Sequence, residues 1–443
     1  MRKILRASAI RFKETFESLA PRKWVAEVIS KRPVRAGRKP GFEVFDLVMS
    51  LVFHVLQIKG NLSEHVNDLT SHIISDSALS QRRTRLDWEV FKTIMDRVLH
   101  PKADSTEHPE CFYKGLRLVG IDGTQFSVSN TPQIDSLLTK SMSRRMKSAF
   151  AKVGAVVLVE LGMRNPIGAA IARNQESEMT LAEEVLPCLP DKSLLIADRY
   201  YGHGSFIDTL LGLDNSSSKK FLLRVKKSLK VTVLENLPDG SRRVEVHSQG
   251  RVFQVRQIIG TVGRKGGKLT EVRFWTNLMD WVTFPALELL KLYSRRWEQE
   301  GFYRELKVDM RSATLLRSHT PETAAQEIGA LIMGYSILAQ ERIAAAAEGQ
   351  IPVLRVSFAK TLDVLSSLWL FLAVAQDIIS PQQTDQLVQA AIEKIICRAV
   401  SPRRKRSCQR ALRQPVSSWP RLFEPSYDST DFVFAVQTSL ITS

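Results

Sequence analysis

The chain has 443 residues, and its 63 Lys and Arg against 46 Asp and Glu give a formal net charge of +17. Apolar residues make up 44% of the sequence, which excludes a disordered polyelectrolyte and allows two or three domains with a sizeable core. A protein this basic usually binds a polyanion, most often nucleic acid, although charge alone also fits a merely soluble basic surface.

The sequence favours a reducing compartment and predicts no membrane partner. Its four cysteines form no CxxC pair, which argues against a structural zinc site and a disulfide framework. The most apolar window, residues 364–375, is too short to span a bilayer. No apolar region with a cleavage site follows Met1-Arg2-Lys3, so we expect a cytoplasmic protein.

Residues 1–105 are predicted to form a helical N-terminal DNA-binding domain. Apolar residues recur at helical spacing in residues 42–51. Two basic clusters, in residues 31–40 and 81–86, could bind DNA. For either cluster taken alone, a solvated charged surface explains the cations equally well.

Residues 106–314 are predicted to form an α/β catalytic core. Apolar runs predict strands at residues 116–128, 153–161, 166–173, 194–198 and 220–225, with helices at 177–186 and 204–213. Three strands, a helix, a lone strand and a further helix form the ribonuclease-H-like order. Residues 226–270 alternate with period two between turn residues, which predicts a β-rich insertion.

Residues 315–443 are predicted to form a helical C-terminal region with a basic tail. The tail holds the cations of residues 402–406 together with Arg410 and Arg413. It could be an arm that contacts DNA or an irregular terminus.

Two aspartates, Asp122 and Asp198, end apolar strand segments of the predicted core. Burying an unpaired carboxylate there would be costly, and a bound metal ion would offset that cost. Each residue also has a simpler explanation. Asp122 with Gly123 could shape a turn, and Asp198 could pair with Arg199 or cap the next helix.

The third candidate acid lies in residues 293–307, which we read as one helix that begins near Pro285. At about 100° per residue, one stripe within roughly 80° holds five side chains: Tyr293, Arg296, Glu300, Arg304 and Lys307. Three other acids fall on the far side: Glu298, Glu305 and Asp309. One acid among cations and a phenol suits a metal-bound phosphodiester better than a core.

The basic neighbours of Glu300 are candidate DNA contacts. Arg296 can bind a phosphate with two hydrogen bonds, and Lys307 can act as a point charge. Tyr293 can donate to a phosphate oxygen or stack on a base. Trp275, near the end of a predicted strand, could stack on an unpaired base, although core packing is the stronger interpretation.

These residues resemble those of the DDE transposases of bacterial insertion sequences, in particular the fourth insertion-sequence family with its Y-R-E-K signature. Tyr293, Arg296, Glu300 and Lys307 reproduce the three gaps of two, three and six residues in that signature. Upstream, Ile121-Asp122-Gly123-Thr124 resembles the first-Asp motif of the family, and Ala197-Asp198-Arg199-Tyr200-Tyr201 resembles the second-Asp motif. The likeness covers most of the chain, including the β insertion.

The resemblance implies a cut-and-paste transposase in which Asp122, Asp198 and Glu300 bind two Mg²⁺ or Mn²⁺ ions per active site. It implies hydrolysis at the element end and attack by the freed 3′-OH on another strand. Tyr293, Arg296 and Lys307 would position the phosphates and terminal bases. Expected partners are the terminal inverted repeats and target DNA, with a dimer in the synaptic complex and association with the bacterial nucleoid when DNA is bound.

Two alternatives stay open from the sequence. The first is a catalytically inactive or domesticated DNA-binding protein, against which the presence of all three acids speaks. The second is a ribonuclease-H-like nuclease or resolvase that cuts DNA without strand transfer. The Y-R-E-K signature and the β insertion favour transposition, but composition does not exclude hydrolysis alone.

Overall fold

A computed structural model describes residues 11–32, 42–57, 59–138, 140, 148–248, 250–264, 267–311, 315–375 and 378–401, together with residues 406–407, 427–428 and 432–436. Most of the basic segment 31–40 and nearly all of the basic tail, including Arg410 and Arg413, lie outside these residues. The chain divides into two compact units. The first comprises residues 1–195, 209–219 and 296–399, and the second comprises residues 196–208, 220–295 and 400–443.

The first unit contains the sheet of the predicted core. Strands β2 (Leu116–Val128), β3 (Lys152–Glu160) and β4 (Asn165–Ile171) pair antiparallel. The strand order is β4-β3-β2-β5, with β5 (Ser193–Ala197) following the three-stranded meander. Two short strands, β1 (Phe112–Tyr113) and β11 (Leu315–Leu316), also pair with β2. This order confirms the predicted ribonuclease-H-like α/β fold.

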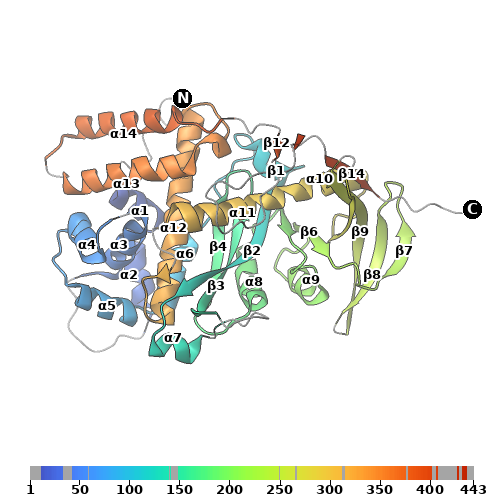
Figure 1. The fold of residues 1–443 in the computed structure, drawn as a ribbon, viewed down its shortest axis with the longest axis horizontal. Helices are drawn as coiled ribbons and strands as arrows, with labels where there is room; N and C mark the ends of the chain where they lie inside the picture. Colours follow the sequence, from blue (N-terminus) through green and yellow to red (C-terminus); the bar gives the residue numbers. More distant parts are fainter. Residues whose placement is uncertain are drawn as a thin grey trace, which may run out of the picture. The chain divides into compact units, whose positions relative to one another are not determined.

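Helix α8 (Glu178–Val185) covers the side of the sheet formed by β3 and β4 (Figure 1). Ser177 begins the helix, since its side chain accepts a hydrogen bond from the Thr180 N–H at 3.1 Å. Leu181, Ala182 and Val185 recur at helical spacing and are buried against the sheet. Every residue of β4 is buried, as expected for a strand covered on both faces.

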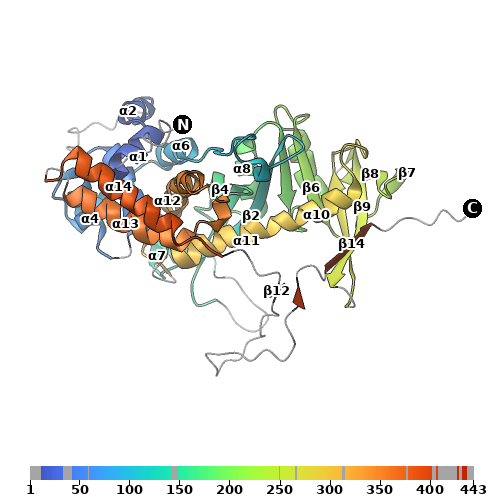
Figure 2. The ribbon, with the colours of Figure 1, turned by 90° about the horizontal axis from the view of Figure 1, so that it is seen from above.

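Helix α12 (Pro321–Glu348) is the central element of the first unit. It begins with Thr320 in a capping box with Thr323, and Pro321 occupies the first helical position. Most of its residues are buried, which marks a helix covered on nearly every side. It contacts β4, α3 (Val44–Leu56), α6 (Trp88–Val98) and α13 (Phe358–Val374), and Figure 2 shows it between α6 and α13.

The remaining helices of the first unit are α1 (Phe12–Leu19), α2 (Arg22–Ser30), α4 (Leu62–Thr70), α5 (Asp76–Arg85), α7 (Pro132–Leu137), α11 (Trp297–Arg304) and α14 (Pro381–Ile396). The helices before residue 105 and those after residue 315 therefore share one compact unit with the sheet. The predicted boundaries at residues 105 and 314 do not separate compact units. A DNA-binding role for residues 1–105 stays a prediction.

The second unit contains the predicted β insertion. Its antiparallel strands follow the order β6 (Lys219–Val225), β10 (Thr270–Thr276), β9 (Arg251–Arg264), β8 (Arg242–Ser248) and β7 (Thr232–Asn236). Strand β14 (Phe432–Val436) pairs with β9, and β12 (Arg406–Ser407) pairs with β13 (Tyr427–Asp428). The prediction of a helical C-terminal region is thus wrong for these residues.

Two further α-helices are α9 (Gly204–Leu211) and α10 (Ala286–Leu292), and short 3-10 helices are η2 (Pro109–Cys111), η3 (Leu186–Cys188) and η6 (Val353–Arg355). Pro285 precedes α10, as predicted for the start of a helix. Among the residues that the structure describes, none of the helices has the length and apolar character that crossing a membrane would require.

Candidate active site

Residues 286–309 form four consecutive helical segments, so the prediction of one continuous α-helix is wrong. After α10, residues Tyr293–Arg296 form a 3-10 turn, η4, and α11 follows directly. The last segment, η5 (Glu305–Asp309), is a π-helical turn, which the Met310 N–H closes by donating to the Glu305 carbonyl at 3.2 Å. Tyr293 belongs to the second unit and the rest of the signature to the first.

Asp122 projects from β2 toward the side of the sheet that α11 covers. A Cβ atom at Gly120 would lie 2.7 Å from the side-chain oxygen of Gln299 on α11. Successive side chains of a strand alternate between its faces, so Asp122 shares the face of Gly120. The neighbouring Gly123 faces the other way, where its Cβ would meet the carboxyl group of Glu178 on α8.

Two hydrogen bonds fix α11 on β2 and β3. The Tyr303 hydroxyl donates to the backbone carbonyl of Asp122 at 2.5 Å, and the Gln299 side chain donates to the carbonyl of Val157 at 3.0 Å. Glu300 follows Gln299 by about 100° around the helix, so it borders the face turned to the sheet. The helix thus carries Glu300 along the face of β2 that bears Asp122.

Glu300 is accessible and paired with a cation. Its side chain is 46% exposed, and Arg296 Nη2 donates to its Oε1 at 3.0 Å. This contact confirms that Arg296 and Glu300 lie on one side of the helix. The Arg296 guanidinium also lies 5.2 Å from the ring centroid of Trp297, which is 64% exposed. An exposed indole beside an arginine is a candidate base-stacking surface that sequence analysis did not select.

Asp198 follows β5 directly and belongs to the second unit. Its Oδ1 accepts a hydrogen bond from the Tyr200 N–H at 2.7 Å, which shapes the turn after the strand. Within the described ranges, no three His, Cys, Asp or Glu side chains lie close enough together to hold a metal ion. Convergence of Asp122, Asp198 and Glu300 therefore stays a prediction.

Lys307 lies in the π turn beside the continuation of β2. Its Nζ donates to the Gln125 carbonyl at 2.8 Å and lies 5.0 Å from the ring centroid of Phe126. Arg311 approaches the same ring at 5.5 Å. Burial, with the nearby charges of Arg311 and Lys152, lowers the pKa of Lys307 to about 8.

The predicted DNA contact Arg304 has an exposed head that pairs with an acid. Its side chain is 57% exposed, and Nη2 lies 3.3 Å from a carboxylate oxygen of Asp309. Asp309 is one of the acids placed opposite the stripe on an ideal helix. The π turn between the two residues brings them together, since it changes the angular spacing after Arg304.

The predicted DNA contact Trp275 is buried in the second unit. Only 1% of the residue is exposed, on β10 between β6 and β9, so in this structure it cannot stack on a base. Core packing, the stronger interpretation from the sequence, describes it correctly. Tyr293 packs beside the same strand, with its ring centroid 4.5 Å from that of Phe274.

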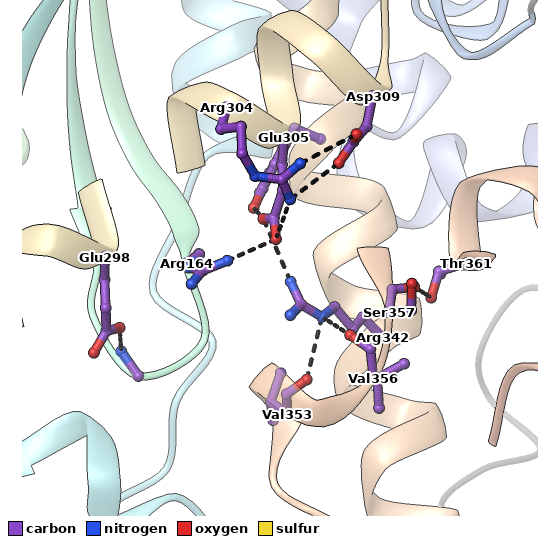
Figure 3. A network of polar contacts seen from close by, with 12 residues as sticks. Arg164, Glu298, Arg304, Glu305, Asp309, Arg342, Val353, Val356, Ser357 and Thr361 are labelled. Carbon is purple, nitrogen blue, oxygen red and sulfur yellow. Dashed lines mark hydrogen bonds and ion pairs between the residues drawn. The ribbon is translucent and has the colours of Figure 1, made fainter. Parts of the chain in front are cut away.

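Glu298 and Glu305, the acids opposite Glu300, attach the helix to the turn between β3 and β4. Glu298 accepts a hydrogen bond from the Gly162 N–H at 2.6 Å, and Glu305 accepts one from Arg164 at 2.6 Å (Figure 3). The position of Arg164 explains why residue 301 is a glycine. A Cβ atom at this position would lie 2.6 Å from Cζ of Arg164. Sequence analysis placed these acids on the far side of the helix, but gave no signal for Arg164.

Comparisons with known proteins identify the family of the chain. A family model described as Transposase DDE domain matches residues 114–337, half of the chain. The chain is 27% identical over 342 residues to Transposase InsG for insertion sequence element IS4 of Escherichia coli (strain K12), covering 72% of this chain and 74% of that protein. It is 25% identical over 238 residues to Putative transposase InsZ of the same organism, covering 50% of this chain and 75% of that protein.

Among solved structures, the chain is similar to a piggyBac transposase, in a cryo-EM structure of its synaptic complex with hairpin DNA. The identity is 10% and the TM-score 0.42, with 87% of this chain and 84% of the other covered. A likeness at this level is too weak to define a common fold.

Proposed function

Since the chain belongs to the DDE transposase family and is a DNA transposase, we propose that Asp122, Asp198 and Glu300 bind its divalent metal ions. The observation that carries the proposal is the placement of Asp122 and α11, which bears Glu300, on one face of β2. Carboxylate oxygens are the ligands that Mg²⁺ and Mn²⁺ prefer, and the exposed carboxylate of Glu300 fits this role.

When bound, two such ions would supply charge stabilisation for the attacking and leaving oxygens of an in-line displacement at phosphorus. The protein's own residues orient the reacting groups. The hydrogen bonds from Tyr303 and Gln299 hold α11 on the sheet, so the Glu300 carboxylate has a fixed direction relative to β2. Arg296, which donates to Glu300, has the planar guanidinium geometry that binds a phosphate with two hydrogen bonds.

We assign DNA contacts to Arg296, Arg304 and Lys307, with Tyr293 as a hydrogen-bond donor or stacking group. The exposed ring of Trp297 adds a stacking surface beside Arg296. The expected substrates are the terminal inverted repeats of an insertion sequence and a target DNA, bound by a dimer in the synaptic complex. We further propose a cytoplasmic protein that associates with the nucleoid through DNA.

A cleavage assay tests the proposal. Purified protein is incubated with a labelled duplex that carries the element end, and with a supercoiled target plasmid. Mg²⁺ should produce a nick at the end and a joined product, and a chelator should abolish both. Binding without cleavage would favour the inactive DNA-binding alternative. Cleavage without a joined product would favour a nuclease, and cleavage in the presence of chelator would contradict a metal-dependent site.

DNA affinity should fall as the pH rises above 8, through Lys307. With its pKa at about 8, this side chain loses its charge in the free protein between pH 7 and 9. A bound phosphate favours the charged form, so binding above pH 8 must take up a proton. The dissociation constant should therefore rise about tenfold per pH unit above the pKa. Fluorescence anisotropy at constant ionic strength measures this, with Lys307→Arg as the control that stays charged. A parallel slope in both proteins would contradict the assignment.

A further inference from the structure

Glu305, an acid on the far side of the helix from Glu300, is one of the most deeply buried charged residues of the first unit. Glu305 is 3% exposed and begins the π turn η5. Its Oε1 accepts a hydrogen bond from Arg164 at 2.6 Å, and its Oε2 accepts one from the Tyr335 hydroxyl at 2.5 Å. Arg342 Nη1 lies 3.6 Å from Oε2, and Arg304 Nη2 lies 3.9 Å from Oε1 (Figure 3).

The partners of Glu305 come from separate parts of the first unit. Arg164 lies in the turn between β3 and β4, and Tyr335 and Arg342 lie on α12. Two of them are held by further contacts. Arg342 is 1% exposed and donates to the carbonyls of Val353 and Val356 at 3.2 and 2.9 Å. Tyr335 stacks on Phe358 with ring centroids 4.5 Å apart.

This network completes a row of attachments along one helical segment. Moving toward the C-terminus, α11 is attached to Gly162 through Glu298, to Val157 through Gln299 and to β2 through Tyr303. Glu305 attaches the π turn to Arg164 and α12. Glu300 lies between these attachments, and Lys307 lies two residues beyond the last. The direction of both side chains therefore depends on contacts that neither of them makes.

The π turn makes the last attachment important for Lys307. A π turn is rare because its wider hydrogen-bond ring packs less well than an α-helical turn, so tertiary contacts must stabilise it. Here the residue that opens the turn is Glu305, the one held by three partners from outside the helix. If those contacts were lost, the segment could return to α-helical geometry, which would rotate Lys307 away from the Gln125 carbonyl.

We propose that Glu305 is a positioning residue for the cleavage reaction. Its carboxylate, clamped by Arg164, Tyr335 and Arg342, keeps Glu300 and Lys307 in the orientation that metal binding and phosphate binding require. This inference rests on the proposed function of Glu300. Outer partners that orient metal ligands typically change metal affinity or activity by about 10-fold to 100-fold when they are removed.

The test compares Glu305→Gln with the wild-type protein in single-turnover cleavage at saturating DNA. We expect a rate about 10-fold to 100-fold lower and a higher Mg²⁺ concentration for half-maximal rate, with a dissociation constant for DNA at pH 7 no higher than that of Lys307→Ala, because the other DNA contacts persist. Tyr335→Phe keeps the ring contacts with Phe302 and Phe358 but removes one hydrogen bond. It should raise the Mg²⁺ concentration for half-maximal rate by a smaller factor. If Glu305→Gln folds poorly, Tyr335→Phe tests the inference in its place.

Glu160→Gln is the matched control. Glu160 is also a fully buried carboxylate of the first unit paired with an arginine, Arg117. Within the described ranges, its hydrogen bonds go to residues outside α11 and η5. It should lower the melting temperature and leave the Mg²⁺ response unchanged at a temperature where the protein is folded. An unchanged Mg²⁺ response in Glu305→Gln and Tyr335→Phe, or an equal shift in Glu160→Gln, would overturn the inference. A wild-type protein that does not cleave would overturn the proposed function and the inference with it.

Discussion

Glu300→Gln is expected to abolish cleavage at the element end while DNA binding persists. The substitution keeps the size of the side chain and removes the charge that a metal ion needs. Charge stabilisation by a bound metal is worth several kcal/mol in the transition state, and each 1.36 kcal/mol is tenfold in rate. We therefore expect a loss on the order of 10³-fold in the single-turnover rate, measured with a labelled duplex and Mg²⁺.

Measuring DNA binding by Glu300→Gln distinguishes a loss of catalysis from a loss of DNA affinity. The substitution removes a negative charge beside Arg296 and beside the DNA backbone, so gel-shift affinity should match or exceed that of wild type. Asp122→Asn should behave in the same way. Glu348→Gln, at the exposed end of α12, is the control and should cleave normally. If Glu300→Gln cleaves at the wild-type rate, Glu300 is not a metal ligand.

The largest effect on stability is expected from Glu160→Ala. Glu160 is fully buried at the end of β3 and forms an ion pair with Arg117. Its carboxylate also accepts from the N–H groups of Lys102 at 3.0 Å and Ala103 at 3.1 Å, and from the side-chain amide of Asn165 at 3.3 Å. Removing one partner of a buried ion pair leaves the other charge and these donors without compensation. That costs about 3–5 kcal/mol.

Thermal unfolding followed by circular dichroism measures this effect. A loss of about 3–5 kcal/mol corresponds to a decrease on the order of 10 °C in the melting temperature of the first unit. Glu183→Ala, an exposed acid on α8, is the control and should change stability by less than about 0.5 kcal/mol. An equal melting temperature for Glu160→Ala and wild type would show that the site tolerates an alanine without loss.

The sequence was sufficient for the strands of the core because each is a local pattern. The apolar run that ends in Asp122 and the one that ends in Asp198 appear as β2 and β5. The alternating residues of the insertion appear as β7, β8 and β9. Strand β14 carried a signal as well, since Phe432–Val436 is rich in β-branched and aromatic residues, but its pairing with β9 depends on a contact far along the chain.

The geometry of residues 293–307 could not be predicted because distant residues determine it. An ideal helix places Glu305 and Asp309 opposite Arg304. The structure pairs Arg304 with Asp309 through the π turn, which Arg164 and Tyr335 help to hold. Trp275 shows a second reason why the sequence was not sufficient. Alternation along a strand tells which residues share a face, but the element that covers the face must be known before an exposed indole can be told from a buried one.

The division of the chain into units has a consequence for any attempt to work with fragments. The first unit is formed by three stretches of sequence, and the β insertion lies between the second and the third. A fragment that stops near residue 315 would lack α12 and leave the apolar faces of α3 and α6 without cover. Such a fragment should aggregate rather than fold. Removing residues 220–295 instead keeps all three stretches, so α12 stays in the chain to cover these faces.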